Sequence, residues 1–128
     1  MTNNSDKKVL VVDDFEPMRE IITEILNRMG YSSIHHAEDG VKALAFLEGN
    51  PDTYLVISDW NMPKMNGLDL LKNLRNTDQL KDIPFLMVTS EADSKCIVEA
   101  AQFGANQFLV KPFTAESMEQ KLNSLFAQ

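Results

Sequence analysis

The sequence predicts a single α/β domain in which a parallel sheet carries helices on both faces. Short apolar runs rich in β-branched residues alternate five times with segments whose apolar residues recur at helical spacing. Regular alternation with short connections is typical of parallel strands joined by right-handed helical crossovers. A chain of 128 residues, 44% hydrophobic and 24% charged, fits one globular domain.

The first strand is predicted at Val9–Val12, where an unbroken run of valine and leucine indicates burial on both faces. Pro17 favours the first turn of the following helix, and Gly30 favours its end. The apolar residues that recur along this helix are Met18, Ile21, Ile22, Ile25 and Met29.

A second strand, Ser33–Ala37, precedes a helix that starts at Gly40. The residues of this helix expected to face the core are Val41, Leu44 and Ala45. A third strand, Tyr54–Ser58, leads directly into Asp59. After the loop Trp60–Asn66, the third helix is marked by Leu68, Leu71 and Leu74.

The fourth strand, Pro84–Val88, runs into Thr89 and Ser90, and the fifth, Gln107–Val110, ends at Lys111. A helix between them, stopped by Gly104, is expected to bury Ile97, Ala100 and Ala101. Thr114 can cap a final helix. The residues of that helix expected to point inward are Met118, Leu122 and Leu125.

Reactive side chains stand at the carboxyl ends of four predicted strands. They are Asp13 and Asp14 after the first strand, Asp59 after the third, Thr89 after the fourth and Lys111 after the fifth. Alone, an aspartate pair after a strand is more often a helix-capping turn, and a lone lysine is more often solvated. Ligands of open parallel sheets bind beyond these strand ends. The joint placement of the five side chains therefore predicts a functional site.

The acidic residues of this edge require a cation. Two carboxylates about 4 Å apart repel by roughly 4 kcal/mol at an effective dielectric constant of about 20. Oxygen ligands without cysteine or well-placed histidine select a hard ion. A site with few carboxylates and with room for water and phosphate suits Mg²⁺ better than Ca²⁺. We therefore expect Mg²⁺ here.

Four segments resemble the CheY-type receiver domain of chemotaxis response regulators: Val11–Asp14, Ser58–Gly67, Val88–Glu91 and Val110–Phe113. The resemblance runs from about Lys8 to Phe126. It divides the chain into a polar tail, residues 1–7, and a receiver domain, residues 8–128. The fold implied is flavodoxin-like and doubly wound, with five helices and five parallel strands in the order 2-1-3-4-5.

This resemblance implies that Asp59 is the phosphoacceptor. Asp14 and Asp59 would bind Mg²⁺ directly, Asp13 largely through water, and the backbone carbonyl of Asn61 would complete the protein ligands. Lys111 would offset the charge that develops on the phosphoryl oxygens. The Lys111–Pro112 bond resembles the family's cis peptide.

Other residues would control the lifetime and the output of the phosphorylated state. Thr89 would bond a phosphoryl oxygen, and the small Ser90 leaves space for its approach. Asn61 and Glu91 would flank the path of the hydrolytic water. The family couples this movement to an aromatic residue of the fifth strand, here Phe108.

The implied partners are a CheA-type histidine kinase, the flagellar switch protein and a CheZ-type phosphatase. The chain would assist its own phosphorylation and dephosphorylation as a signalling phosphoacceptor, not as an enzyme acting on a separate substrate. We expect a cytoplasmic monomer. A net charge of -7 disfavours nucleic acid, and no apolar run is long enough to span a membrane.

Some residues depart from the relatives that bind the flagellar switch. Tyrosine is common there at the position of Phe108, and lysines are common at those of Asp93 and Ser94, whereas Lys121 matches. A phosphate sink, which accepts and discards phosphoryl groups without binding the motor, is therefore a near-equal alternative to motor control. A non-motor interaction module is a further alternative.

Two catalytic or cofactor-binding classes fit less well. A flavodoxin holds phosphate on a loop rich in hydroxyl groups and glycine after the first strand, where Asp13 and Asp14 would repel it. A haloacid dehalogenase phosphatase requires a D-x-D spacing that Asp13-Asp14-Phe15 lacks.

Four remaining residues have simpler interpretations. His35 and His36 should point to opposite faces of their strand and be structural. Cys96 should pack in a helix. Trp60 should lie exposed beside the site, so that its fluorescence reports Mg²⁺ or phosphate.

Overall fold

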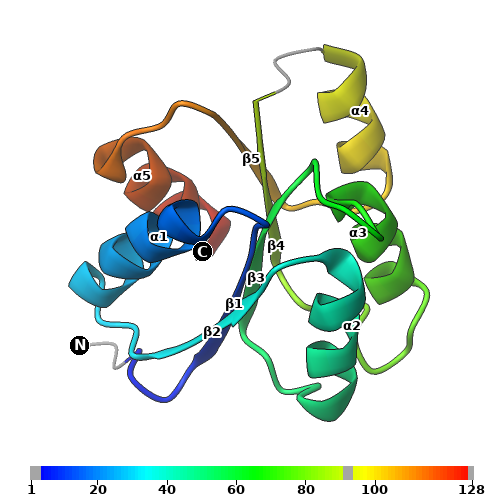
Figure 1. Ribbon diagram of the computed structural model, residues 1–128, viewed down its shortest axis with the longest axis horizontal. Helices are drawn as coiled ribbons and strands as arrows, with labels where there is room; N and C mark the ends of the chain where they lie inside the picture. Colours follow the sequence, from blue (N-terminus) through cyan, green and yellow to red (C-terminus); the bar gives the residue numbers. More distant parts are fainter. Residues whose placement is uncertain (1–3, 91–93, 127–128) are drawn as a thin grey trace.

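The computed structural model describes residues 4–90 and 94–126, and strands and helices alternate along them (Figure 1). The strands are β1 (Lys8–Val12), β2 (Ser33–Ala37), β3 (Leu55–Asp59), β4 (Phe85–Thr89) and β5 (Gln107–Val110). The helices are α1 (Glu16–Arg28), α2 (Gly40–Gly49), α3 (Gly67–Arg75), α4 (Ser94–Gln102) and α5 (Ala115–Phe126). The predicted alternation is confirmed, with strand boundaries that agree to within one residue.

The strands form one parallel sheet in the order β2-β1-β3-β4-β5, which confirms the order that the resemblance implied. Val12 at the end of β1 lies opposite both Ala37 in β2 and Ser58 in β3. Thr89 at the end of β4 lies opposite Val110 in β5. The strands therefore end together at one edge, and the strand order reverses at β1.

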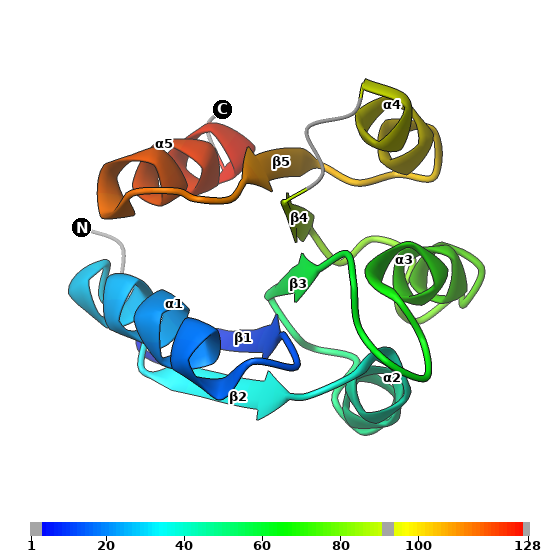
Figure 2. The same cartoon turned by 45° about the horizontal axis from the view of Figure 1, so that its top comes forward.

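Helices cover both faces of the sheet, with α1 and α5 on one side and α2, α3 and α4 on the other (Figures 1 and 2). Buried side chains form one hydrophobic cluster under each layer of helices. Leu10 and Val12 belong to the cluster under α2, α3 and α4, and Val9 and Val11 to the cluster under α1 and α5. As predicted, β1 is buried on both faces.

The predicted core face of α2 is wrong in two of its three residues. Val41 is 49% exposed and Ala45 is also exposed, whereas Leu44 is half-buried. The apolar side chains of this helix that are fully buried are those of Ala43 and Leu47. Because six of the ten residues of this helix are Ala, Val, Leu or Phe, helical periodicity does not single out one apolar face.

Contacts at its N-terminus fix the orientation of α2. An oxygen of the Asp39 side chain accepts a hydrogen bond from the Lys42 N–H at 2.8 Å and caps the helix. The N–H of Gly40 donates to the carbonyl of Met65 at 3.1 Å, and a Cβ at Gly40 would lie 2.5 Å from that oxygen. Neither contact leaves a periodic signal in the sequence.

In two other helices one apolar residue lies outward against the prediction. Ile21 in α1 is 49% exposed and Ala101 in α4 is exposed, whereas their neighbours Ile22 and Ala100 are buried. Ile97 is half-buried. Each exposed residue is next in sequence to a buried one. Helical periodicity does not distinguish residues at the centre of a helix's apolar face from those at its border.

The predicted helix ends are confirmed. Gly30 and Gly104 have φ angles of +96° and +98°, a conformation that glycine adopts without strain, and they follow α1 and α4. At α5, Thr114 Oγ1 accepts from the Ser117 N–H at 3.0 Å, and Ser117 Oγ accepts from the Thr114 N–H at 3.0 Å. Thr114 therefore caps this helix in a reciprocal pair.

The two histidines of β2 face opposite sides of the sheet, as predicted. The His35 ring packs against Phe46 of α2 with centroids 4.9 Å apart, and His36 Nε2 lies 2.8 Å from Thr23 Oγ1 of α1. Burial is the main cause that lowers the pKa of His36. Within residues 4–90 and 94–126, no helix combines the length and the apolar character needed to cross a membrane.

Candidate functional site

Four strands deliver the candidate site residues to the carboxyl edge of the sheet. Asp13 follows β1 directly, Asp59 is the last residue of β3, Thr89 is the last residue of β4 and Lys111 follows β5. Asp13, Asp59 and Thr89 are buried, with exposed fractions of 1%, 8% and 1%. The predicted convergence at this edge is therefore present in the fold.

Three carboxylates meet at this edge. Asp13, Asp14 and Asp59 each offer an oxygen, and these oxygens lie within 4.8 Å of one another. Asp14 is exposed, so the cluster is open to solvent on one side. All the donors are oxygen atoms at a spacing that one small ion can bridge, which fits a hard divalent cation such as Mg²⁺. The Asp13 side chain does not cap α1; one oxygen accepts from the Phe15 N–H at 2.9 Å, and α1 has no side-chain cap.

Lys111 faces the acids. Its Nζ lies 3.2 Å from Asp13 Oδ2 and 3.3 Å from Asp59 Oδ1, and its side chain is 20% exposed. The Lys111 N–H donates to the Thr89 carbonyl at 2.8 Å and so ties the end of β5 to the end of β4. The Lys111–Pro112 bond is cis, as the resemblance implied.

The surroundings of Asp59 disfavour its charged form on balance. Burial raises the pKa of Asp59 above its ordinary value, and the nearby Asp13 carboxylate adds to the rise. The Lys111 ammonium and a hydrogen bond from the Trp60 N–H act in the opposite direction. A bound divalent cation would add a further stabilising charge for the carboxylate.

Arg19 holds the backbone of Asp13 and was missed by sequence reasoning. Its Nη1 donates to the Asp13 carbonyl at 2.6 Å, and its side chain is 13% exposed. Its Nε is the one buried side-chain nitrogen or oxygen without a hydrogen-bond partner among the described residues that are not exposed. The available signal was an arginine in the first turns of the helix that follows the acidic pair.

Close packing of glycine fixes the loop after Asp59. The Gly67 N–H donates to the Trp60 carbonyl at 2.8 Å, and a Cβ at Gly67 would lie 2.2 Å from the Asp59 carbonyl oxygen. Asn66 caps α3 through its side chain, which accepts from the Asp69 N–H at 2.8 Å. The sequence placed Gly67 directly after the predicted loop Trp60–Asn66, but its contact with Asp59 depends on tertiary structure.

Trp60 is half-buried, so the prediction of an exposed ring is wrong. Its side chain packs against the hydrophobic cluster under α2, α3 and α4, and this contact covers part of the indole ring. Asn61 and Ser90 are exposed beside the site. Trp60 still adjoins Asp59 and remains a usable fluorescence reporter.

Phe108 and Lys121, two of the predicted output residues, do not belong to the acidic cluster. Phe108 in β5 is half-buried against the cluster under α2, α3 and α4, and Lys121 in α5 is half-buried. Glu91 and Asp93 lie outside the described residues, and Ser94 begins α4. Three exposed apolar side chains stand on α4, β5 and the turn between them: Val98, Phe103 and Val110.

Comparison with known sequences gives one consistent result. The family model of the response regulator receiver domain matches residues 9–123. The chain is 46% identical over 123 residues to chemotaxis protein CheY-3 of Vibrio cholerae serotype O1, across 96% of this chain and 94% of that protein. It is 46% identical over 115 residues to chemotaxis protein CheY1 of Helicobacter pylori, across 90% of this chain and 93% of that protein.

Solved structures agree on the fold. The chain matches chemotaxis response regulator CheY4 of Vibrio cholerae with a TM-score of 0.86 and 36% identity, over 94% of this chain and 98% of that one. It also matches a chain of the CheX–CheY complex with BeF₃ and Mg²⁺ from Borrelia burgdorferi. The TM-score is 0.90 and the identity 28%, over 97% of this chain and 92% of that one.

Proposed function

This chain belongs to the response regulator receiver domain family, and we propose that its Asp59 accepts a phosphoryl group from a CheA-type histidine kinase in chemotaxis. The observation that carries the proposal is the meeting of three carboxylates within 4.8 Å of one another, two of them paired with Lys111. The receiver domain would comprise residues 8–128 after a polar tail of residues 1–7. We place it in the cytoplasm as a monomer.

We assign Mg²⁺ to this cluster. The carboxylates of Asp13, Asp14 and Asp59 and the backbone carbonyl of Asn61 would hold it. When bound, the ion supplies positive charge to the oxygens of the transferring phosphoryl group. The Borrelia burgdorferi CheY structure was solved with BeF₃ and Mg²⁺, which supports the same ion for this chain.

Phosphoryl transfer to Asp59 needs little chemistry from other side chains. A carboxylate oxygen attacks phosphorus in line, the new P–O bond forms as the P–N bond to the donor histidine breaks, and the histidine nitrogen keeps the electron pair. An ionised carboxylate needs no general base. Asp59 Oδ1 already accepts the Trp60 N–H at 2.9 Å, which orients the group.

Lys111 would exchange partners during this step. In the unphosphorylated protein it lies 3.3 Å from Asp59 Oδ1 and 3.2 Å from Asp13 Oδ2. Once Asp59 is phosphorylated, negative charge is carried by the phosphoryl oxygens of the acyl phosphate, and the ammonium can pair with one of them. Thr89, at the end of the adjacent strand, would donate a hydrogen bond to another.

The acyl phosphate is also the source of its own decay. Water attacks phosphorus, the Asp59 carboxylate leaves, and inorganic phosphate departs. The exposed Asn61 flanks the entry to this site, and Glu91 would flank it from the segment after β4. We propose that these two positions tune the lifetime of the signal and that a CheZ-type phosphatase shortens it further.

The proposed output is control of the flagellar switch through α4, β5 and α5. Val98 in α4 and Val110 in β5 are 54% and 38% exposed, and such apolar side chains suit contact with a partner helix or peptide. Phe108 and Ser90 would follow the movement of Thr89, and Lys121 would contribute charge. The phosphate-sink alternative is favoured by Phe108, which lacks a hydroxyl group, and by the acidic Asp93.

Intact-mass measurement after incubation with acetyl phosphate tests the phosphoacceptor role. We expect a single phosphoryl adduct that requires Mg²⁺ and is absent in Asp59→Asn. Asp52→Asn is the matched control, because Asp52 is an exposed aspartate that pairs with Lys8 at 3.0 Å, far from the acidic cluster. An adduct that persists in Asp59→Asn or forms without Mg²⁺ contradicts the proposal.

Capture of a flagellar switch peptide separates the two outputs. Motor control requires that the BeF₃-loaded protein bind the peptide more tightly than the unloaded protein. A phosphate sink requires normal adduct formation with no gain in peptide binding.

A further inference from the structure

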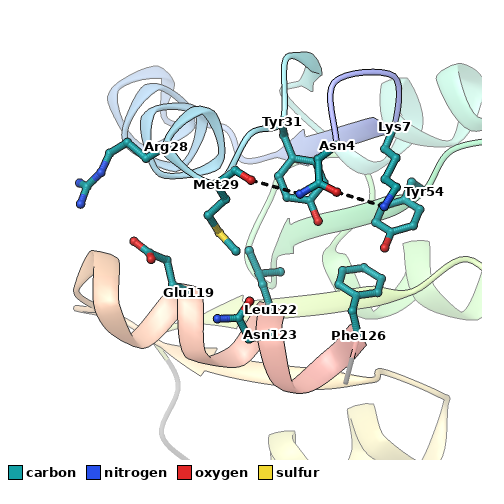
Figure 3. A pocket seen from close by; sticks show the side chains of 10 residues that line it. All are labelled: Asn4, Lys7, Arg28, Met29, Tyr31, Tyr54, Glu119, Leu122, Asn123 and Phe126. Atoms are coloured by element: carbon teal, nitrogen blue, oxygen red, sulfur yellow. Dashed lines mark hydrogen bonds between the residues drawn. The ribbon is translucent and has the colours of Figure 1, made fainter. Parts of the chain in front are cut away.

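A pocket lies at the end of the sheet opposite Asp59, where β1 and β3 begin and α1 and α5 approach each other (Figure 3). Its volume is about 480 Å³, within the range of roughly 300–1,000 Å³ that small-molecule sites occupy. The residues that line it are Asn4, Lys7, Arg28, Met29, Tyr31, Tyr54, Glu119, Leu122, Asn123 and Phe126. None of them belongs to the acidic cluster.

Aromatic rings form one wall of this pocket. The Tyr54 and Phe126 rings stack with centroids 4.6 Å apart and planes 19° apart. The Tyr31 ring lies 6.3 Å from Tyr54 at an angle of 38°. Leu122 from α5 lies across from Tyr31 (Figure 3). Such a wall favours a flat apolar group in contact with it.

The hydroxyl group of Tyr31 points into the pocket (Figure 3). Tyr31 as a whole is only 4% exposed and lines the pocket. The hydroxyl groups of Tyr31 and Tyr54 both point toward α5 (Figure 3). Burial, with Tyr54 as a second cause, raises the pKa of Tyr31 to about 12, so the phenol remains a donor at neutral pH. This hydroxyl can therefore donate a hydrogen bond to an acceptor that enters the pocket.

A cation is held beside the same rings. Lys7 Nζ lies 4.6 Å from the centroid of the Tyr54 ring and donates to Asn4 Oδ1 at 3.0 Å. Asn4 is itself anchored, because its Nδ2 donates to the Met29 carbonyl at 3.1 Å. Lys7 and Arg28 outnumber the single lining acid, Glu119, which lies on the far wall from Lys7 (Figure 3). The end of the pocket near Tyr54 therefore attracts an anion.

We propose that this pocket binds a small planar aromatic carboxylate. The ring packs against the wall of Tyr31, Tyr54 and Phe126, and the carboxylate accepts hydrogen bonds from the Tyr31 hydroxyl and the Lys7 ammonium. A neutral aromatic ligand would bring no counter-charge for Lys7, and an aliphatic acid would leave the aromatic wall uncovered. The site is separate from the acidic cluster and does not depend on phosphorylation.

Titration of the ¹⁵N-labelled full chain with 2-naphthoate tests this proposal by chemical-shift mapping. We expect saturable shifts centred on the amides of Tyr31, Tyr54, Leu122 and Phe126, with a Kd of about 1 mM or tighter. The uncharged 2-naphthamide should bind at least about fivefold more weakly, because it lacks the charge that Lys7 attracts.

Variants connect the binding to individual side chains. Lys7→Gln and Tyr31→Phe should each weaken 2-naphthoate binding by about fivefold or more. Lys72→Gln is the matched control, because Lys72 also lies over a ring, at 4.4 Å from the Phe103 centroid, but on the opposite side of the sheet; it should change nothing. The spectra also verify that each variant is folded. Unsaturable or scattered shifts, equal binding of 2-naphthamide, or unchanged affinity in Lys7→Gln would overturn the proposal.

Discussion

Lys111 is the side chain on which the electrostatics of the acidic edge depend. It pairs with Asp13 and Asp59, which are 1% and 8% exposed, whereas Asp14 is turned to solvent. Burial already raises the pKa of Asp59, because the folded surroundings disfavour its charged form. Removal of the lysine would leave two buried negative charges without their counter-charge.

We predict that Lys111→Met lowers the free energy of unfolding by about 2 kcal/mol at neutral pH without Mg²⁺. The loss should shrink at low pH, where protonation of Asp59 removes one of the unpaired charges, and saturating Mg²⁺ should recover part of it. Urea unfolding with and without Mg²⁺ measures this.

Lys64→Met is the matched control for this measurement. Lys64 also pairs with a buried aspartate, Asp39, but at 3.8 Å and with 64% of its own side chain exposed. Its loss should cost less than about 1 kcal/mol. Equal effects of the two variants, or a Lys111→Met protein as stable as the parent, would show that the pairing at the acidic edge has little energetic weight.

At the scale of elements, the sequence predicted strands better than helix faces. Strands buried on both sides appear as continuous apolar runs such as Val9–Val12, and all five strands were located to within one residue. The face of α2 was not predictable because contacts of Asp39 and Gly40, not periodicity, orient this apolar helix. The half-buried position of Trp60 likewise depends on its tertiary contact with the hydrophobic cluster under α2, α3 and α4.

Gly67 links the start of α3 to the phosphoacceptor strand. We predict that Gly67→Ala lowers the free energy of unfolding by more than about 2 kcal/mol and displaces Asp59, because its Cβ would lie 2.2 Å from the Asp59 carbonyl oxygen. Gly49→Ala, at the end of α2 with no atom within 4 Å of the added Cβ, should instead gain about 0.5–1 kcal/mol. Urea unfolding of both variants compares them. Similar stabilities would contradict the packing described for the loop after Asp59.

At the scale of the molecule, two hydrophobic clusters hold one sheet whose opposite edges carry different chemistry. The acidic edge was predictable because residues that end parallel strands must meet, whatever their side chains. The pocket at the opposite edge was not, since Tyr31, Tyr54 and Phe126 come from three separate segments and show no common spacing. The bond from Arg19 to the Asp13 carbonyl was not predicted either, because a contact with a backbone atom follows no side-chain pattern.

Burial of Tyr31 sets an alkaline limit to the fold. Its pKa is raised from 10.0 to about 12, so the unfolded chain releases this proton first as the pH rises. The contribution of Tyr31 to the free energy of unfolding is therefore full below pH 10. It is lost between the two pKa values, and the total loss is about 2–3 kcal/mol. Tyr31→Phe should remove that part of the decline in urea unfolding between pH 9 and 11.5. An identical pH profile in the variant would exclude Tyr31 as the group responsible.

The most direct test of the central claim is to locate the phosphoryl group. Borohydride reduces an aspartyl phosphate to homoserine, so the protein is treated with acetyl phosphate and Mg²⁺, reduced, digested and sequenced by mass spectrometry. We predict homoserine at position 59 alone, and only when Mg²⁺ is present. Homoserine at position 13 or 14, or none at position 59, would contradict the assignment of Asp59 as the phosphoacceptor.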